Sequence, residues 1–156
     1  MSSERLVIRR ESLEAPVAAQ LIGALNAELR RRYPEPGANH FRLDSDEVAA
    51  GRGAFFVAYR GEQPVGCGAV RVRDDGSAEI KRMYVAPEER GGGVGKAILA
   101  VLEGEARRLG AGRLVLETGV RQQEAIGLYR RAGFVEIPPF GEYDGAVLSQ
   151  CFGKEL

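Results

Sequence analysis

Four glycines and two basic residues in one short segment form the clearest candidate binding site of this chain. The segment runs from Arg90 to Lys96 with the sequence RGGGVGK, follows a strand-like stretch at 78–85 and opens a helical pattern. Glycines leave the backbone exposed, and the first N–H groups of a helix have no carbonyl partner within it. Those donors and the helix dipole favour a phosphate group. The segment therefore predicts a phosphate-binding loop, with an ordinary glycine-rich turn as the alternative.

Spacing argues against two common phosphate loops. A Walker A loop needs a glycine, then four residues of any type, then Gly-Lys-Ser/Thr, whereas here Arg90 holds the first position and Ala97 follows Lys96. The hydroxyl that would bind magnesium is therefore missing. A Gly-x-Gly-x-x-Gly dinucleotide loop that began at Gly91 would need a glycine where Lys96 stands. A nucleotide-binding protein is the disfavoured interpretation.

Length and charge define the broad class of protein. The chain has 156 residues, of which 44% are apolar and 28% charged, so one globular domain over residues 1–156 is expected. Lys plus Arg equals Asp plus Glu at 22 each, which argues against nucleic acid or an anionic membrane as the main partner. No apolar run approaches the roughly 20 residues that span a bilayer. Residues 1–10 lack a signal-peptide pattern, so a cytoplasmic protein is expected.

Two cysteines and one histidine are too few for a structural metal site. Cys67 and Cys151 each lie within an apolar, strand-like run. Buried, reduced thiols are therefore expected at both positions. With His40 as the single histidine, no metal site is predicted.

Hydrophobic periodicity divides the chain into strands and helices. The predicted strands are residues 5–10, 54–59, 65–72, 78–85, 113–117, 134–137 and 146–152, and the predicted helices are 16–32, 44–50, 92–109 and 122–132. Short links join the strands between 54 and 85, which predicts an antiparallel meander. The order indicates a mixed α/β fold, with about seven strands in one sheet flanked by four helices.

Three blocks, in order and at matching spacing, resemble the GNAT family of N-acetyltransferases. The strand 78–85 (AEIKRMYV) is similar to the family's fourth strand. Arg90, Gly93 and Gly95 meet the family's pyrophosphate-loop pattern, Arg/Gln-x-x-Gly-x-Gly/Ala. Residues 125–134 (AIGLYRRAGF) resemble its helix that ends in Leu-Tyr-x-x-x-Gly-Phe. The resemblance covers nearly the whole chain and implies the acyl-CoA N-acyltransferase fold with a mostly antiparallel sheet. In that fold the pantetheine arm of acetyl-CoA lies between the splayed fourth and fifth strands.

The resemblance also implies which residues bind acetyl-CoA. Backbone groups of Met83, Tyr84 and Val85 would bond the pantetheine amides, in the way that a peptide adds to an open sheet edge. The pyrophosphate would be held by the backbone amides of Arg90, Gly91, Gly92, Gly93, Val94, Gly95 and Lys96. The Arg90 and Lys96 side chains could add charge, with a surface role equally open for Lys96. One departure is Gln122, where many members have an asparagine.

Amine acetylation needs a base for the amine, a donor to the oxyanion and an acid for the leaving thiolate. The resemblance implies that Glu79 is the base and Tyr129 the acid, with a backbone N–H near Val85 as the oxyanion donor. The structural alternatives are a strand carboxylate paired with a basic neighbour and a core tyrosine.

The predicted function is transfer of the acetyl group of acetyl-CoA to a primary amine of a small molecule or protein, by direct attack in a ternary complex. A non-catalytic acyl-CoA-binding or sensor module on the same fold is the alternative. His40 and Tyr143 are weak candidates for the acceptor pocket, and the sequence does not identify the acceptor. A homodimer that pairs through the last strands is left open.

Overall fold

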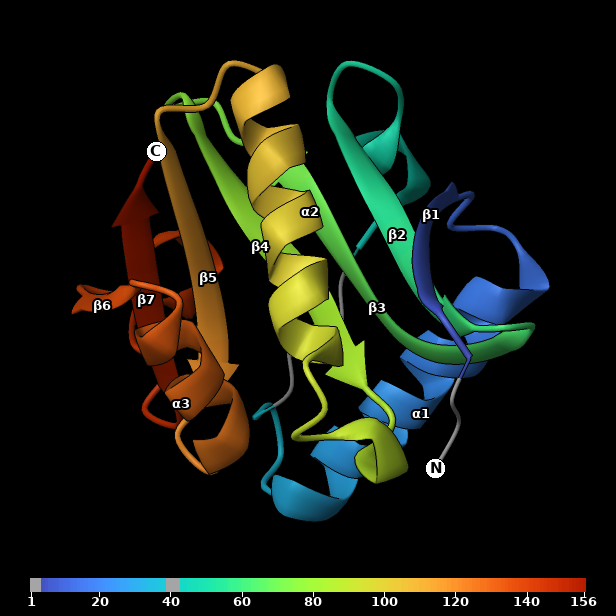
Figure 1. Cartoon of the computed structure of the whole chain (residues 1–156). Helices are drawn as coiled ribbons and strands as arrows, with labels where there is room; N and C mark the ends of the chain where they lie inside the picture. Colours follow the sequence, from blue (N-terminus) through green and yellow to red (C-terminus); the bar gives the residue numbers. More distant parts are fainter. Residues whose placement is uncertain (1–3, 39–42) are drawn as a thin grey trace.

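The chain folds around one seven-stranded sheet, seen here in a computed structural model that describes residues 4–38 and 43–156 (Figure 1). The strands are β1 (Leu6–Glu11), β2 (Gly53–Arg60), β3 (Gln63–Val72), β4 (Ser77–Val85), β5 (Arg113–Gly119), β6 (Val135–Ile137) and β7 (Ser149–Glu155). The α-helices are α1 (Pro16–Arg32), α2 (Val94–Arg108) and α3 (Gln123–Arg131). Their sheet order is β1-β2-β3-β4-β5-β7-β6.

The predicted mixed fold and mostly antiparallel sheet are confirmed. Strands β2, β3 and β4 pair antiparallel with their neighbours along the chain, as the expected meander requires. The pairing of β4 with β5 is parallel, and α2 makes the crossover between them. All other pairings in the described sheet are antiparallel.

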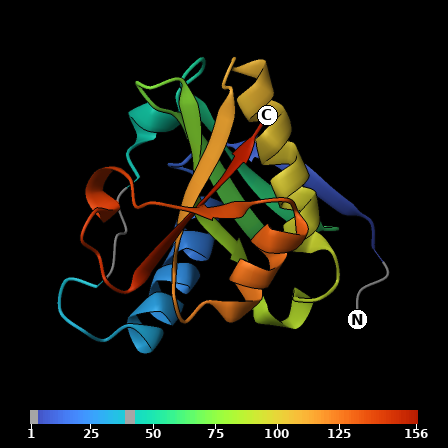
Figure 2. The same ribbon diagram turned by 90° about the vertical axis from the view of Figure 1, so that its left-hand side faces the viewer.

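The sheet has a hydrophobic cluster on each face. One cluster packs α2 and α3 on one face, through residues such as Ile98, Leu102 and Ile126. The other packs α1 on the opposite face, through Leu21 and Leu25. Figure 2 shows the sheet between these two helical layers. Strand β2 is buried on both faces, which explains why its sequence is continuously apolar and does not alternate.

The prediction of four helices was wrong by one. The segment predicted as a helix at 44–50 forms a 3-10 turn at Ser45–Val48, with Asp44 and Glu47 in a capping box, so three α-helices occupy the described residues. A box of this kind satisfies the first amides of a turn as well as those of a longer helix. Further 3-10 turns lie at Pro87–Glu89 and Gly141–Tyr143.

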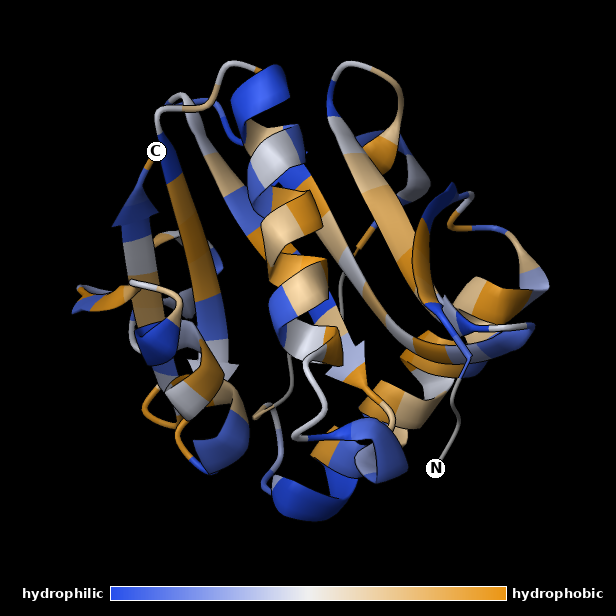
Figure 3. Ribbon diagram, in the orientation of Figure 1, coloured by the Kyte–Doolittle hydropathy of each residue, from blue (hydrophilic) through white to orange (hydrophobic). Residues whose placement is uncertain are grey.

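Hydrophilic residues gather at one end of the molecule, in the last turn of α1 and in the turn before α2 (Figure 3). This is the end at which β4 and β5 finish (Figure 1). None of the helices described is long and apolar enough to cross a membrane. A binding site is therefore expected at this polar end of the sheet.

Candidate active site

Strands β4 and β5 separate halfway along their length. Their parallel pairing runs only from Ser77↔Arg113 to Ile80↔Leu116, although β4 continues to Val85 and β5 to Gly119. Beyond that point the two strands diverge toward their C-terminal ends (Figure 1). The sheet edge of β4 that faces β5 is therefore open over its last five residues, 81–85. Backbone groups there, including those of Met83, Tyr84 and Val85, can pair with a ligand as they would with a strand.

A β-bulge lies where the strands separate. Pairing with β3 advances by two residues, from Cys67 to Ala69, while β4 advances by three, from Tyr84 to Lys81. Arg82 adopts φ 53°, the one positive φ among the described non-glycine residues. The Cys67 thiol donates to the Arg82 carbonyl oxygen at 3.3 Å, and burial raises the pKa of this thiol to about 12. The bulge re-aims the side chains of β4 at the opening, as bulges beside functional sites do.

A cleft of about 780 Å³ lies between the end of β4, the glycine loop, α2 and α3. Gly93 precedes the helix with φ 90° and provides no side-chain cap, so the first amides of α2 face the cleft without carbonyl partners. A Cβ at Gly93 would have open space around it, whereas one at Gly95 would lie 2.8 Å from Leu128 on α3. Gly93 thus keeps the loop backbone accessible, and Gly95 allows α2 to pack closely against α3.

The two basic residues of the loop have different roles. Arg90 donates from Nε to the Val85 carbonyl at 2.9 Å and from Nη2 to Glu28 on α1 at 2.8 Å. Its guanidinium therefore fixes the loop to β4 and α1, and its predicted contribution of charge to a pyrophosphate is limited by these bonds. Lys96 is exposed on the rim of the cleft, with no hydrogen bond or ion pair to any described residue. It is the cation of the loop that is available to a phosphate.

A smaller chamber of about 90 Å³ lies behind the cleft, on the α1 side of the splayed strands. Met83, Ala125 and Tyr129 line both spaces, so the chamber meets the cleft at these residues. A group transferred from one space to the other would pass this junction. Tyr129 is 5% exposed, and burial, with the negative charge of Glu117, raises the pKa of its phenol. The phenol is therefore protonated at neutral pH, and within the described chain its hydroxyl has no hydrogen-bond partner.

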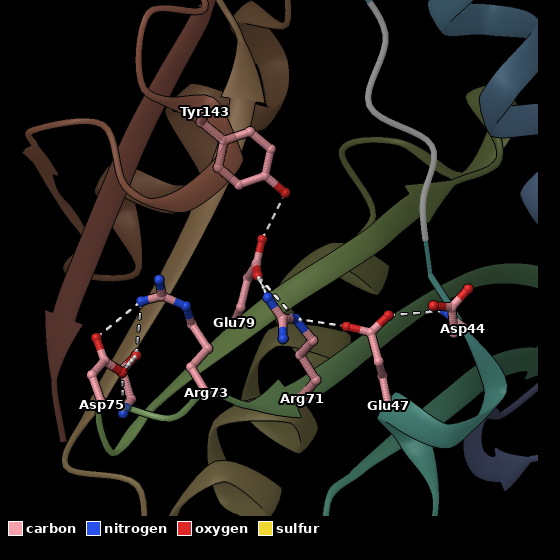
Figure 4. Close-up of polar contacts among 8 residues, drawn as sticks. Asp44, Glu47, Arg71, Arg73, Asp75, Glu79 and Tyr143 are labelled. Atoms are coloured by element: carbon pink, nitrogen blue, oxygen red, sulfur yellow. Dashed lines mark hydrogen bonds and ion pairs between the residues drawn. The ribbon is translucent and has the colours of Figure 1, made fainter.

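Glu79 lies outside the lining of both spaces. It is 1% exposed, and its Oε1 accepts from Arg71 at 2.9 and 3.1 Å. The Tyr143 hydroxyl donates to Oε2 at 2.7 Å, and Glu47 holds the other side of Arg71 at 3.1 Å (Figure 4). Burial and the Glu79 charge raise the pKa of Tyr143. Both carboxylate oxygens of Glu79, the predicted base, therefore already accept hydrogen bonds. Through one of these bonds Glu79 positions Tyr143, which lines the chamber.

The carboxylate on the chamber wall is Glu117 of β5, which the sequence reasoning missed. It follows Leu116, the last residue of β5 that pairs with β4, and its Oε2 accepts from Ser149 at 2.6 Å. Its charge acts on the phenols of Tyr129 and Tyr143. The signal was available: a carboxylate directly after the apolar run 114–116 stands at the carboxyl end of a parallel strand, where ligands of open sheets bind.

Helix α1 makes a side-chain contact with each part of the site. Its Asn26 accepts from Arg82 at 2.6 Å, and its Glu28 accepts from Arg90. Arg32 donates to Gln122 at 2.9 Å, at the N-terminus of α3. Gln122 therefore joins α3 to α1 without capping α3, and it lines both spaces. His40, the other predicted acceptor-pocket residue, lies outside the described residues.

A seven-stranded sheet that splays beside a glycine loop is the arrangement of the acyl-CoA N-acyltransferase fold. Residues 20–134 match the family model described as "Acetyltransferase (GNAT) family", and the chain belongs to that family. It is accordingly an acetyl-CoA-dependent acyltransferase.

Two relatives match over nearly their whole length. An IAA acetyltransferase of Azospirillum brasilense is 41% identical over 152 residues, which are 97% of this chain and 98% of that protein. A crystal structure described as an acyl-CoA N-acyltransferase of Klebsiella pneumoniae superposes with a TM-score of 0.82 at 30% identity, with 97% of each chain covered. A second structure, described as a streptothricin acetyltransferase of Bacillus anthracis in complex with acetyl coenzyme A, has a TM-score of 0.65 at 20% identity, and the match covers 78% of this chain and 73% of that one. This similarity, at 20% identity, is a similarity of fold alone.

Proposed function

We propose that the protein transfers the acetyl group of acetyl-CoA directly to a primary amine, with both substrates bound at once. The observation that carries this proposal is the junction of the two spaces at Met83, Ala125 and Tyr129. The large cleft offers loop amides for a pyrophosphate and an open strand edge for an amide-bearing arm. The chamber offers a carboxylate and a phenol. Direct attack requires that a donor site and an acceptor site meet at one point, and this arrangement provides it.

The binding of acetyl-CoA in the cleft draws support from several features of the chain. Five of the seven predicted loop residues line one rim, and Gly93 presents no side chain toward the space. The other two are Gly92 and Val94, of which Val94 packs in the core. Lys96 adds a free positive charge at the same rim. The fold relative from Bacillus anthracis is described with acetyl coenzyme A. The thioester would supply the activated acetyl group at the junction.

We assign the base of the reaction to Glu117 and the acid to Tyr129. Glu117 lines the chamber, where it can accept a proton from an ammonium group, either directly or through water. The free amine then attacks the thioester carbon, the C–S bond breaks, and the Tyr129 hydroxyl donates its proton to the departing thiolate. The attacking nitrogen loses its extra proton to the Tyr129 phenolate, directly or through water, which gives the neutral amide, and Glu117 returns its proton to solvent. Glu79, the base predicted from sequence, is in this proposal a positioning residue that acts through Tyr143.

Release of free thiol from acetyl-CoA in the presence of a panel of amines, amino acids and peptides tests the proposal. We expect acceptor-dependent thiol release, together with a rise in melting temperature with acetyl-CoA or CoA and none with ATP. Stabilisation by acetyl-CoA with no thiol release for any acceptor would favour a binding module. Stabilisation by ATP alone would overturn the assignment of the cleft.

A further inference from the structure

The lining of the chamber contains a buried lysine whose charge no side chain in the described part of the protein pairs with. Lys81 lines the chamber and is 8% exposed. Within residues 4–38 and 43–156, its side chain makes no hydrogen bond or ion pair. An ammonium group on so buried a side chain has a desolvation cost unless an anion lies beside it. A lysine in this position indicates that the balancing anion belongs to the ligand.

The nearby carboxylates are already used by other groups. Glu79 lies two residues before Lys81 on β4, but Arg71 occupies its Oε1 and Tyr143 its Oε2. Glu117 accepts from Ser149 and lines the opposite wall. Arg82, the next residue along β4, adds a second positive charge to the chamber lining and donates to Asn26. The β4 wall is therefore cationic and the β5 wall anionic.

The register of the two strands fixes this separation of charge. Ile80 and Leu116 form the last parallel pair, and both face the cluster that packs α2 and α3. Since side chains alternate along a strand, Lys81 and Glu117, one residue further on, face the chamber from opposite sides of the gap. An ammonium and a carboxylate thus flank the opening where an acceptor would enter.

We infer that the acceptor is a small amino carboxylic acid: Lys81 binds its carboxylate, and Glu117 faces its amine. This inference rests on the proposed acetyl transfer. The chamber of about 90 Å³ suits a compact head group that carries both charges. A polyamine would place a second positive charge beside Lys81, and a lysine side chain of a protein would leave the Lys81 ammonium without an anion.

The test compares each of the twenty amino acids with its own amide as acceptor, by initial rates of thiol release from acetyl-CoA. The amides lose their amine proton more readily and are the better nucleophiles in solution. A preference for the acids must therefore come from the protein. We expect kcat/KM about tenfold or more higher for the best acids than for their amides, as for a charge-assisted hydrogen bond.

Two variants assign that preference to Lys81. In Lys81→Met the ratio of kcat/KM for an acid to kcat/KM for its amide should fall about tenfold, and Lys81→Arg should restore part of that ratio. If neither variant folds, the comparison of acids with amides in the natural chain decides alone. Amides that match or exceed the acids, or an acetyl group found on Lys81 itself by mass spectrometry, would overturn the inference and leave amine acetylation intact. Absence of thiol release with every amine would instead defeat the proposed function.

Discussion

The cofactor half and the acceptor half of the site are built in different ways. The proposed cofactor half relies on the backbone of one short loop, 90–96, and glycines keep that backbone accessible. The acceptor half uses side chains that come from β4, β5, β7 and the helices on both faces of the sheet. A backbone site suits a ligand that is the same throughout a family, whereas a side-chain site can change with each acceptor. Variants on the two halves should therefore affect different kinetic constants.

The largest expected effect is on the acceptor half. Glu117→Gln keeps the shape of the side chain and removes the base, so kcat should fall about 10²-fold or more. Glu79→Gln is the matched control, because it makes the same change in the carboxylate that both Arg71 and Tyr143 hold. Glu79→Gln should lower the free energy of unfolding by about 2 kcal/mol, because it weakens charged hydrogen bonds. It should reduce kcat far less than Glu117→Gln does. Initial rates from pH 6 to 9 and thermal melts measure both. The reverse ranking of the two variants would return the base to Glu79.

On the cofactor half, Gly93→Val should weaken acetyl-CoA binding by about tenfold or more, roughly 1.4 kcal/mol. The new side chain would occupy the space where the loop amides meet the cleft. The backbone at Gly93 has φ 90°, so a valine there is also strained. Gly76→Val controls for that strain, because Gly76 has φ 83°, equally open surroundings and a place in the turn between β3 and β4. Calorimetric titration that gave both variants the same acetyl-CoA affinity would contradict the loop assignment.

Tyr129 stands at the junction, and its loss should affect the chemical step and neither binding constant. Tyr129→Phe removes the proton donor, so kcat should fall on the order of tenfold while KM changes little. Among the residues that the structure describes, none forms a hydrogen bond with the Tyr129 hydroxyl, so Tyr129→Phe leaves no partner unsatisfied. The melting temperature should therefore hold. A destabilised variant with unchanged turnover would make Tyr129 a core residue.

The smallest effect concerns the edge of the acceptor half, where Glu35 after α1 meets Arg121 after β5 at 2.6 Å. The hydrogen bond from Arg121 lowers the pKa of Glu35 from 4.5 to about 2. A lowered carboxyl pKa stabilises the fold above pH 4.5, and this stabilisation is lost as the pH falls toward 2. Both groups are solvent-exposed, so Glu35→Gln should lower the melting temperature by about one or two degrees at pH 7. The difference in melting temperature between Glu35→Gln and the natural chain should disappear as the pH falls toward 2. A constant difference down to pH 2 would contradict the stabilising role of the Glu35–Arg121 pair.

The sequence predicts the elements around the cleft better than the contacts within the chamber, for a physical reason. The glycine loop, its helix and the strand before it are adjacent in the chain, so short-range spacing describes them. The partners of Glu79 are not adjacent: Tyr143 reaches it from 64 residues away. The strand register that brings Lys81 opposite Glu117 depends on a parallel pairing formed across α2. Periodicity predicts which residues form β4 and β5, but not where their pairing stops.

Helix α1 extends behind both halves and holds a side chain from each: Arg90 of the loop through Glu28, and Arg82 of the bulge through Asn26. A displacement of α1 would move the loop 90–96 and the wall of the chamber together. Such a shared support makes the affinities of the two substrates interdependent, and thermodynamic linkage requires the dependence to be reciprocal. If bound acetyl-CoA changes the affinity for the acceptor by some factor, then bound acceptor changes the affinity for acetyl-CoA by the same factor. A helix that contributes no reacting group can thereby couple the binding of the two substrates.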